Sequence, residues 1–349
     1  MTKRPENIII GISIGDLNGV GSEVILKSFE DTRMLELCTP VIFANVKILS
    51  FLKKSLNLNV NLHGIDKIEQ ALTGKINVLN IWREGVNVEY GKVDENVGKY
   101  AVKSFVEATK ALKEGAIDAL VTAPINKSNI QSEEFSFPGH TDYLDQELEG
   151  DALMFMIQDN LRVGLLTDHV PLNEVAKHLT EELIRKKIKT IHQSLIQDFG
   201  INRPRIAVLG LNPHSGDNGV IGDEEEKVLK PAMKKIFEEG ILVFGPFSAD
   251  GFFGSNQYEK YDAVIATYHD QGLIPFKTLS FGKGVNYTAG LNKIRTSPDH
   301  GTGFDIAGKG IAEHQSFLEA IYAAIDIFKS RNDYKDIVAN PLKVKEKQL

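Results

Sequence analysis

The sequence has one cysteine, no long apolar run and no concentrated positive charge, and each absence excludes a class of protein. Cys38 alone cannot form a disulfide within the chain. No apolar stretch reaches the roughly 18 residues that a membrane-spanning helix needs. The formal net charge is -7, and no block of Lys and Arg could hold a nucleic acid or an anionic membrane. We therefore expect the protein to bind a small molecule, and to bind neither a nucleic acid nor a membrane.

The N-terminus also lacks the pattern of a targeting segment. The first residues, MTKRPENIII, enter a strand-like run without the apolar core of a signal peptide. With 349 residues, of which 42% are hydrophobic, the chain is long enough to bury a real core in one large domain or in two. We expect a cytoplasmic protein that folds unaided.

Strand-like runs alternate with helical patterns along the whole chain, which predicts an α/β fold with a mostly parallel sheet. The segment VGKYAVKSFVEATKALKEG has one apolar face, and Gly115 can end the helix before the strand AIDALVTAP. Further helices are predicted from about Gly21, from Glu182 to Phe199, and over HQSFLEAIYAAIDIFK. No tandem repeat or low-complexity linker marks a domain boundary.

Three strand-like segments end in a histidine. RVGLLTDH ends at His169, RIAVLGLNPH at His214 and AVIATYH at His269. Ligands of open α/β sheets bind beyond the carboxyl ends of parallel strands, so these side chains can converge in one crevice. Three imidazoles and a water form a usual coordination set for a catalytic divalent metal. The alternative is that each histidine caps a strand, and no His-x-x-x-His pair decides between the two.

Polar residues also cluster in two loops that follow strands or turns. They are Thr122, Asn126 and Lys127 in VTAPINK, and His140, Thr141 and Asp142 in FPGHTDY. The glycine of the second loop allows the backbone to approach a ligand closely. An ordinary surface loop is the alternative for each.

A third polar group follows the segment YHDQG. It contains Lys277, Asn286 and Arg295, and cations with an amide suit a phosphate or a carboxylate. Lys283 lies in the same stretch, and we interpret it as a solvated charge. The glycine-rich segment SIGDLNGVGSE matches neither the Rossmann nor the Walker pattern, so it predicts a tight strand-to-helix turn. A dinucleotide would therefore bind without the Rossmann fingerprint.

Six ordered motifs between about residues 8 and 312 resemble those of the 4-hydroxythreonine-4-phosphate dehydrogenase family of vitamin B6 synthesis. They are GDLNGVGSE, VTAPINK, PGHTDYL, LNPHSGDNGVIGDEE, YHDQGLIPFK and GVNYTAGLNKIRTSPDHGTGFDIAG. Such an ordered set is far more specific than one motif. The resemblance implies an isocitrate/isopropylmalate dehydrogenase-like fold, with two α/β/α domains around a central cleft. We assign residues 1–128 plus 290–349 to the first domain and residues 129–289 to the second.

The resemblance also implies roles for individual residues. The metal ligands would be His169, His214 and His269, and the substrate contacts would be His140, Thr141, Lys277, Asn286 and Arg295. The stretch PDHGTGFDIAGKG resembles the loop that holds the adenosine end of NAD in related dehydrogenases, which assigns cofactor binding to Asp299, His300, Gly301 and Thr302. Asp270 and Lys277 are both candidates for proton transfer, and the sequence cannot rank them.

The implied reaction is an oxidation of 4-phosphooxy-L-threonine by NAD (or NADP), followed by decarboxylation to 3-amino-2-oxopropyl phosphate. It would need one divalent metal ion (Zn, Mg or Co), held in this family by ligands from both subunits of a homodimer. The family usually has Pro-Ala at Leu17-Asn18, Thr at Asp168 and Glu at Asp142. These departures leave open a different four-carbon phosphorylated hydroxy acid, such as a threonate or erythronate phosphate. A metal-free phosphate acyltransferase-like protein on the same fold is the alternative from another class, and a non-catalytic binding protein is disfavoured.

Overall fold

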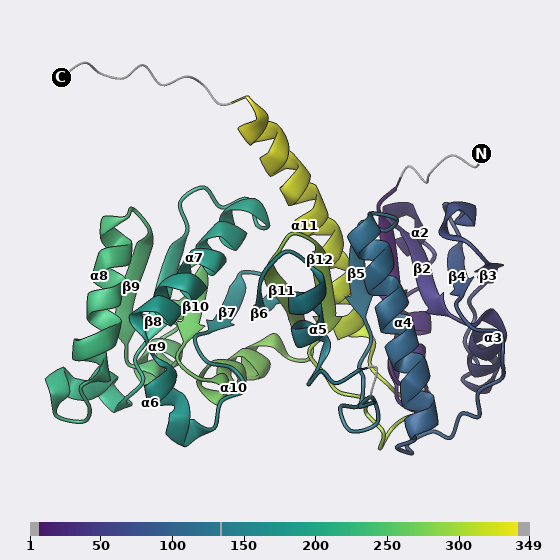
Figure 1. Ribbon diagram of the computed structural model, residues 1–349, viewed down its shortest axis with the longest axis horizontal. Coiled ribbons are helices and arrows are strands. Elements are labelled where there is room, and N and C mark those ends of the chain that lie inside the picture. The colour runs from purple at the N-terminus through teal and green to yellow at the C-terminus, as the bar shows by residue number, and fades with distance from the viewer. Residues whose placement is uncertain (1–6, 133–134, 341–349) are drawn as a thin grey trace.

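The computed structural model describes residues 7–132 and 135–340 and confirms the α/β class (Figure 1). The strands are β1 Ile9–Ser13, β2 Thr39–Ala44, β3 Leu62–Ile65, β4 Ile76–Asn80, β5 Ala119–Thr122, β6 Gly150–Gln158, β7 Leu161–Leu165, β8 Arg205–Leu209, β9 Leu242–Phe247, β10 Ala263–Ala266, β11 Val285–Leu291 and β12 Ile294–Pro298. The helices are α1 Gly21–Lys27, α2 Met34–Leu37, α3 Val46–Ser55, α4 Glu95–Glu114, α5 His140–Glu147, α6 Val175–His178, α7 Glu181–Gln197, α8 Lys230–Glu238, α9 Ala249–Gly254, α10 His269–Ser280 and α11 Gln315–Ala339.

The strands form one continuous sheet across the molecule. Their order is β3-β4-β2-β1-β5-β12-β11-β6-β7-β10-β8-β9, and Figure 1 shows β3 and α3 at one end and β9 and α8 at the other. Neighbouring strands are parallel throughout the first six of this order, from β3 to β12, and again throughout the last four, from β7 to β9. At the centre, β11 pairs antiparallel with β12 and β6, and β6 pairs antiparallel with β7. The mostly parallel sheet is therefore confirmed, but its two parallel halves run in opposite directions.

The predicted domain division is not marked by a break in this sheet. The first predicted boundary, at residues 128 and 129, lies between β5 and α5, and the second, at residues 289 and 290, lies inside β11. Since β11 links both halves through continuous pairing, the two domains stay a prediction.

Alternation along the strands distributes the core over both faces of the sheet. In β1, Ile10 and Ile12 belong to one apolar cluster and Ile9 to another, as expected where successive side chains point to opposite faces. The first cluster includes Ile191 of α7 and Ile321 of α11, and the second includes residues of α4 and α5. The sheet is thus covered on both faces, which is a three-layer α/β/α arrangement.

The helix ends follow from residues that the sequence shows. The side chain of Asp94 accepts a hydrogen bond from the N–H of Asn96 at the start of α4, and Gly115 ends this helix in the left-handed region with φ 76°. The helix predicted over residues 182–199 is α7, which starts one residue earlier with Thr180 as its N-cap. The last helix, α11, continues beyond its predicted end to Ala339. None of the helices in the described part of the chain is long and apolar enough to cross a membrane.

A buried ionic network joins α7, β11 and α11 where the two halves meet. Nε of Arg331 donates to Asp198 at 2.6 Å, and its Nη2 donates to the Tyr287 hydroxyl at 2.9 Å. The Tyr287 hydroxyl donates to the second Asp198 oxygen at 2.6 Å. Burial, and next the Asp198 carboxylate, raise the pKa of Tyr287 well above its ordinary value, so it remains a donor. The single carboxylate of Asp198 therefore compensates the buried guanidinium.

We predict that Asp198→Asn lowers the free energy of unfolding by about 3–5 kcal/mol, because it leaves the Arg331 charge buried without a partner. Urea unfolding measures this loss. The control is Glu174→Gln, which removes an exposed ion pair to Lys177 and should cost at most about 1 kcal/mol. Equal losses in the two variants would contradict the prediction.

Candidate functional site

A cavity of about 380 Å³ opens beside the centre of the sheet. Its walls come from the ends of β5 and β12, from β6 and β11, from the start of α5, from the segment after β7 and from α10. It brings together these predicted substrate and cofactor residues: His140, Thr141, Lys277, Asn286, Arg295, Asp299, His300 and Gly301. Of the predicted metal ligands, His169 lines it. His214, His269, Asp270 and Thr302 are not part of its lining.

Arg295 is a buried cation without a counter-ion among the described residues. The residue is 2% exposed, and its Nε and Nη2 both donate to Thr122 Oγ1, at 3.1 and 2.6 Å. Its Nη1 donates to Thr288 Oγ1 at 3.2 Å. Burial lowers the pKa of Arg295 to about 9, so the guanidinium is charged at neutral pH. No carboxylate among the described residues pairs with it, and a charge left in this state favours binding of an anion.

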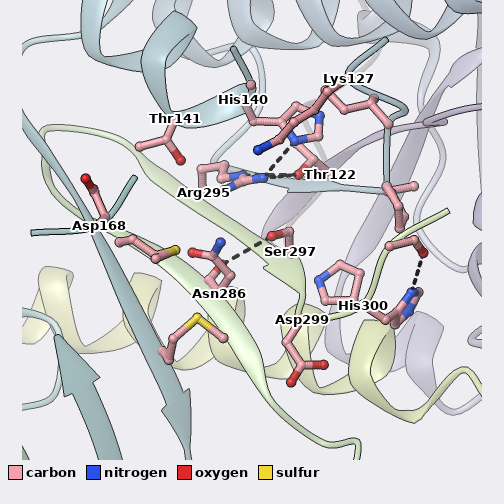
Figure 2. A pocket seen from close by; sticks show the side chains of 18 of the residues that line it. Thr122, Lys127, His140, Thr141, Asp168, Asn286, Arg295, Ser297, Asp299 and His300 are labelled. Atoms are coloured by element: carbon pink, nitrogen blue, oxygen red, sulfur yellow. Dashed lines mark hydrogen bonds between the residues drawn. The ribbon is translucent and has the colours of Figure 1, made fainter. Parts of the chain in front are cut away.

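His140 presents a hydrogen-bond donor beside that cation. Its Nδ1 lies 3.1 Å from Nη2 of Arg295 (Figure 2). Because a guanidinium only donates, Nδ1 is the acceptor and the ring proton sits on Nε2. Although the residue is partly exposed, Nε2 is buried and has no partner among the described residues. Burial, then Arg295 and Lys127, lower the pKa of His140 well below its ordinary value, so the ring is neutral.

The surroundings of Arg295 and His140 complete a site for an oxyanion. His140 is the first residue of α5, and no side chain caps this helix, so its N–H groups remain available to an anion. Figure 2 shows Thr141 and Lys127 beside the same part of the cavity. A guanidinium, an ammonium, a neutral N–H and a helix N-terminus together suit a phosphate group.

The three predicted metal ligands follow neighbouring strands. β10 pairs in parallel with β7 on one side and with β8 on the other, so His169, His269 and His214 follow carboxyl ends at one edge of the sheet. The rings of His169 and His269 lie 6.0 Å apart between centroids. Nδ1 of His269 is 2.7 Å from the Asp270 carboxylate, which fixes the tautomer with Nε2 free as a ligand.

His214 takes a different position. It lies in the 3₁₀ segment Pro213–Gly219 with φ 53°, in the left-handed region that is uncommon for a histidine. Within residues 7–132 and 135–340, no three His, Cys, Asp or Glu side chains are grouped to hold a metal ion. The imidazoles of His169 and His269 and the carboxylate of Asp270 are chemical groups that suit a divalent metal site. The three-histidine site stays a prediction.

The predicted cofactor loop is braced by the glycine-rich turn after β1. Nζ of Lys277 donates to the carbonyl of Asp299 at 2.9 Å, and the N–H of Val20 donates to the carbonyl of Thr302 at 2.9 Å. A Cβ on Gly19 would lie 2.7 Å from that Thr302 oxygen. The turn between β1 and α1 is therefore the tight turn that the sequence predicts, and Gly19 permits its close approach to the loop.

Several residues of the site were not assigned a role from the sequence. Thr122 and Lys127 belong to the polar cluster in VTAPINK. Their closeness to Arg295 and His140 depends on the pairing of β5 with β12, which the sequence does not show. Thr288 lies inside β11, in a motif that suggested no role for it, and the cavity-lining Met156 lies inside β6, outside every motif. Only the alternation along β6 and β11, once their pairing is known, indicates which side chains face the cavity.

The fold and the cavity thus define an α/β protein whose central cavity has a buried cation and a neutral N–H donor, a combination that suits a small phosphorylated molecule. The family of pyridoxal phosphate biosynthetic protein PdxA matches residues 36–324. A 4-hydroxythreonine-4-phosphate dehydrogenase of Bacteroides thetaiotaomicron is 50% identical over 338 residues, which are 96% of this chain and 93% of the relative. The chain belongs to the PdxA family.

Two further relatives bear on structure and on substrate. The crystal structure of the Klebsiella pneumoniae 4-hydroxythreonine-4-phosphate dehydrogenase matches with a TM-score of 0.81 and 34% identity, over 93% of this chain and 99% of that one. A protein of Oceanobacillus iheyensis with the provisional name D-threonate 4-phosphate dehydrogenase is 39% identical, over 94% of this chain and 99% of the relative. The family therefore includes proteins named for two different substrates.

We predict that Arg295→Gln weakens binding of inorganic phosphate by about 1.5–3 kcal/mol, or about tenfold to more than a hundredfold, because a charge-assisted hydrogen bond is lost. Titration calorimetry measures the affinity. The same variant should unfold at an equal or higher temperature than the wild type without ligand, since it removes an uncompensated buried charge.

Lys283→Gln is the matched control, because Lys283 is exposed and does not line the cavity. It should bind phosphate as the wild type does. An Arg295→Gln protein with wild-type phosphate affinity would show that the guanidinium only holds β5 and β11 together.

Proposed function

We propose that the chain oxidises 4-phosphooxy-L-threonine with NAD and decarboxylates the product to 3-amino-2-oxopropyl phosphate in pyridoxal phosphate synthesis. The observation that carries this proposal is the guanidinium of Arg295 beside the N–H of His140, both without a partner of their kind among the described residues (an anion for the first, an acceptor for the second), in a cavity that His169 also lines. The named relatives support the choice of substrate, because they act on the same phosphorylated amino acid by name.

The phosphate group would bind between Arg295, His140, Thr141 and the first N–H groups of α5. Oδ1 of Asn286 is buried, has no partner in the described part of the chain and can accept a hydrogen bond from a substrate hydroxyl. The carbon chain would then cross β11 and β6 towards His169. This placement uses the donors and acceptors that the described residues leave unsatisfied.

Two cofactors fit the remaining residues. NAD would bind along Asp299, His300, Gly301 and Thr302, and a divalent ion (Zn, Mg or Co) would bind to His169, His214 and His269. When bound, the nicotinamide supplies a hydride acceptor and the metal supplies Lewis acidity at the substrate hydroxyl. Asp270 orients His269 through the bond to Nδ1, and Lys277 holds the carbonyl of Asp299.

The two proton-transfer candidates differ in their surroundings. The side chain of Asp270 is 70% exposed and is engaged with His269, which suits a residue that orients a ligand. Lys277 lines the cavity and carries an ammonium proton. Loss of carbon dioxide leaves an electron pair on the α-carbon, and we assign the proton that it takes up to Lys277.

Exposed apolar side chains near each predicted ligand support a homodimer with the site at its interface. Leu172 is 71% exposed three residues after His169, and Ile274 is 63% exposed five residues after His269. Val220 is 81% exposed in the segment that follows His214. A second subunit that covers these side chains would bury apolar surface and could bring the third histidine to the facing pair.

We predict NADH formation with 4-phosphooxy-L-threonine, and at least about tenfold lower kcat/KM with D-threonate 4-phosphate and with erythronate 4-phosphate. Absorbance of NADH measures all three reactions. Preference for an acid without the amino group would assign the chain to a different substrate. If none of them is oxidised, and acyl coenzyme A and inorganic phosphate give an acyl phosphate and free coenzyme A, the acyltransferase alternative would replace the proposal.

We predict that His214→Ala binds less divalent metal than the wild type, whereas His178→Ala, at an exposed histidine of α6, binds the wild-type amount. Elemental analysis of protein purified without chelator measures both. Light scattering should show a dimer. Equal metal in the two variants would remove His214 from the site, and a fully active monomer would refute the shared interface.

A further inference from the structure

A glutamine of α10 is hydrogen-bonded to the residues that follow two strands of the sheet. Gln271 is half-buried in the first turn of α10. Its Oε1 accepts a hydrogen bond from the N–H of Thr267 at 2.7 Å and another from the Thr267 hydroxyl at 2.9 Å. Its Nε2 donates to the carbonyl of Gly210, directly after β8, at 2.6 Å. Since a backbone N–H only donates and a carbonyl only accepts, these partners fix both ends of the amide.

Thr267 extends this connection to a third strand. It is fully buried and lies directly after β10. Its carbonyl accepts a hydrogen bond from the hydroxyl of Thr167 at 2.7 Å and another from the N–H of Thr167 at 3.2 Å. Thr167 is 4% exposed and follows β7, which pairs with β10. Gln271, Thr267 and Thr167 therefore join the carboxyl ends of β7, β10 and β8, and we call these three residues the strand-end clamp.

Close packing of α10 on the sheet brings Gln271 within reach of these strand ends. A Cβ on Gly272 would lie 2.9 Å from the side chain of Leu165 in β7 and 3.0 Å from that of Ala266 in β10. The absence of a side chain at Gly272 therefore allows the first turn of α10 to lie against both strands. Leu273 belongs to the same apolar cluster as Leu165 and Ala266, which holds the turn in this position.

The segments that the strand-end clamp joins contain the predicted metal ligands. His169 and His269 each follow a threonine of the clamp by two residues, and His214 follows Gly210 by four. All three histidines lie outside the strands, so sheet pairing alone does not fix their backbone positions. A metal site needs its donor atoms in place to within about 0.2 Å. The carboxylate of Asp270 orients the ring of His269, and the strand-end clamp fixes the backbone from which that ring projects.

We propose that Gln271 is a positioning residue, which holds the three segments with the predicted metal ligands at the spacing that a divalent ion requires. This inference rests on the metal site of the proposed function. Gln271 acts through backbone groups and through Thr267, so its loss changes the placement of the ligands and leaves their number unchanged. The strand-end clamp lies within one subunit, and it acts in the same way where the ligands of one ion come from both subunits.

Gln271→Met tests the inference, because Met keeps the length of the side chain and removes both hydrogen-bonding ends. We expect the dissociation constant for Zn²⁺ to rise about tenfold to a hundredfold, the range for residues that orient metal ligands. Competition for Zn²⁺ between the whole chain and a chromogenic chelator measures it, well below the unfolding temperature of each protein. A clamp that served folding alone would lower the unfolding temperature and leave the zinc affinity unchanged.

Two further variants change the strand-end clamp beyond β7. Thr167→Val removes the hydroxyl and should raise the zinc dissociation constant about threefold to tenfold, because one neutral hydrogen bond is lost. Thr167→Ser keeps the hydroxyl and should stay within about twofold of the wild type. Thr278→Val is the matched control, since the exposed Thr278 hydroxyl donates to the carbonyl of Ile274 inside α10 at 2.8 Å. It should also bind zinc as the wild type does.

The outcomes separate the inference from the proposed function. Wild-type zinc affinity in both Gln271→Met and Thr167→Val would overturn the inference alone, and so would an equal loss of affinity in Thr278→Val. If Gln271→Met does not fold, equal affinities of Thr167→Val and Thr167→Ser would overturn it. A wild type that binds no zinc would overturn the metal site of the proposed function and the inference together.

Discussion

The site depends on one electrostatic constraint, which is a guanidinium buried among neutral partners. Thr122 and Thr288 hold the Arg295 head group through hydroxyl oxygens, which satisfy its N–H donors but leave its charge uncompensated. Burial and then the same charge lower the pKa of His140 and keep the ring neutral, and the contact with Arg295 directs its proton to Nε2. A carboxylate in place of either threonine would neutralise the site and remove the reason for an anion to bind. The stability lost by burying the free cation is recovered when the ligand arrives, so folding and binding are linked through this residue.

This arrangement requires the antiparallel strands at the centre of the sheet. β5 and β7 run in opposite directions because β11 and β6 reverse the chain between them. Thr122 at the end of β5 and His169 beyond β7 therefore reach one cavity from opposite edges. In a fully parallel sheet, β5 and β7 would end at the same edge. The central strands would then not lie between Thr122 and His169. The network of Asp198, Tyr287 and Arg331 fixes β11 to α7 and α11, so it stabilises the strand that links the halves.

Sequence reasoning predicted the fold class, the helix that Gly115 ends and the positions of three histidines after three strands, and the structure shows that these strands are neighbours. These features depend on local periodicity and on residues adjacent in the chain. It did not predict that α10 begins at His269 itself, because Tyr-His-Asp-Gln-Gly has no capping signature and Pro275 lies inside the helix. The hydrogen-bond partners of Arg295 could not be predicted either, since Thr122 is 173 residues away in the sequence and contacts Arg295 only because β5 pairs with β12. Motifs thus located the site, whereas strand pairing determined its electrostatics.

The unsatisfied groups of the cavity constrain the ligand more narrowly than the motifs do. His140 Nε2 offers a proton and Asn286 Oδ1 accepts one, and both atoms are buried without partners among the described residues. The buried guanidinium of Arg295 favours negative charge in the ligand. A neutral sugar would not supply this charge. A phosphorylated molecule with a free hydroxyl meets these demands, and the names of the relatives lead to the same class of molecule.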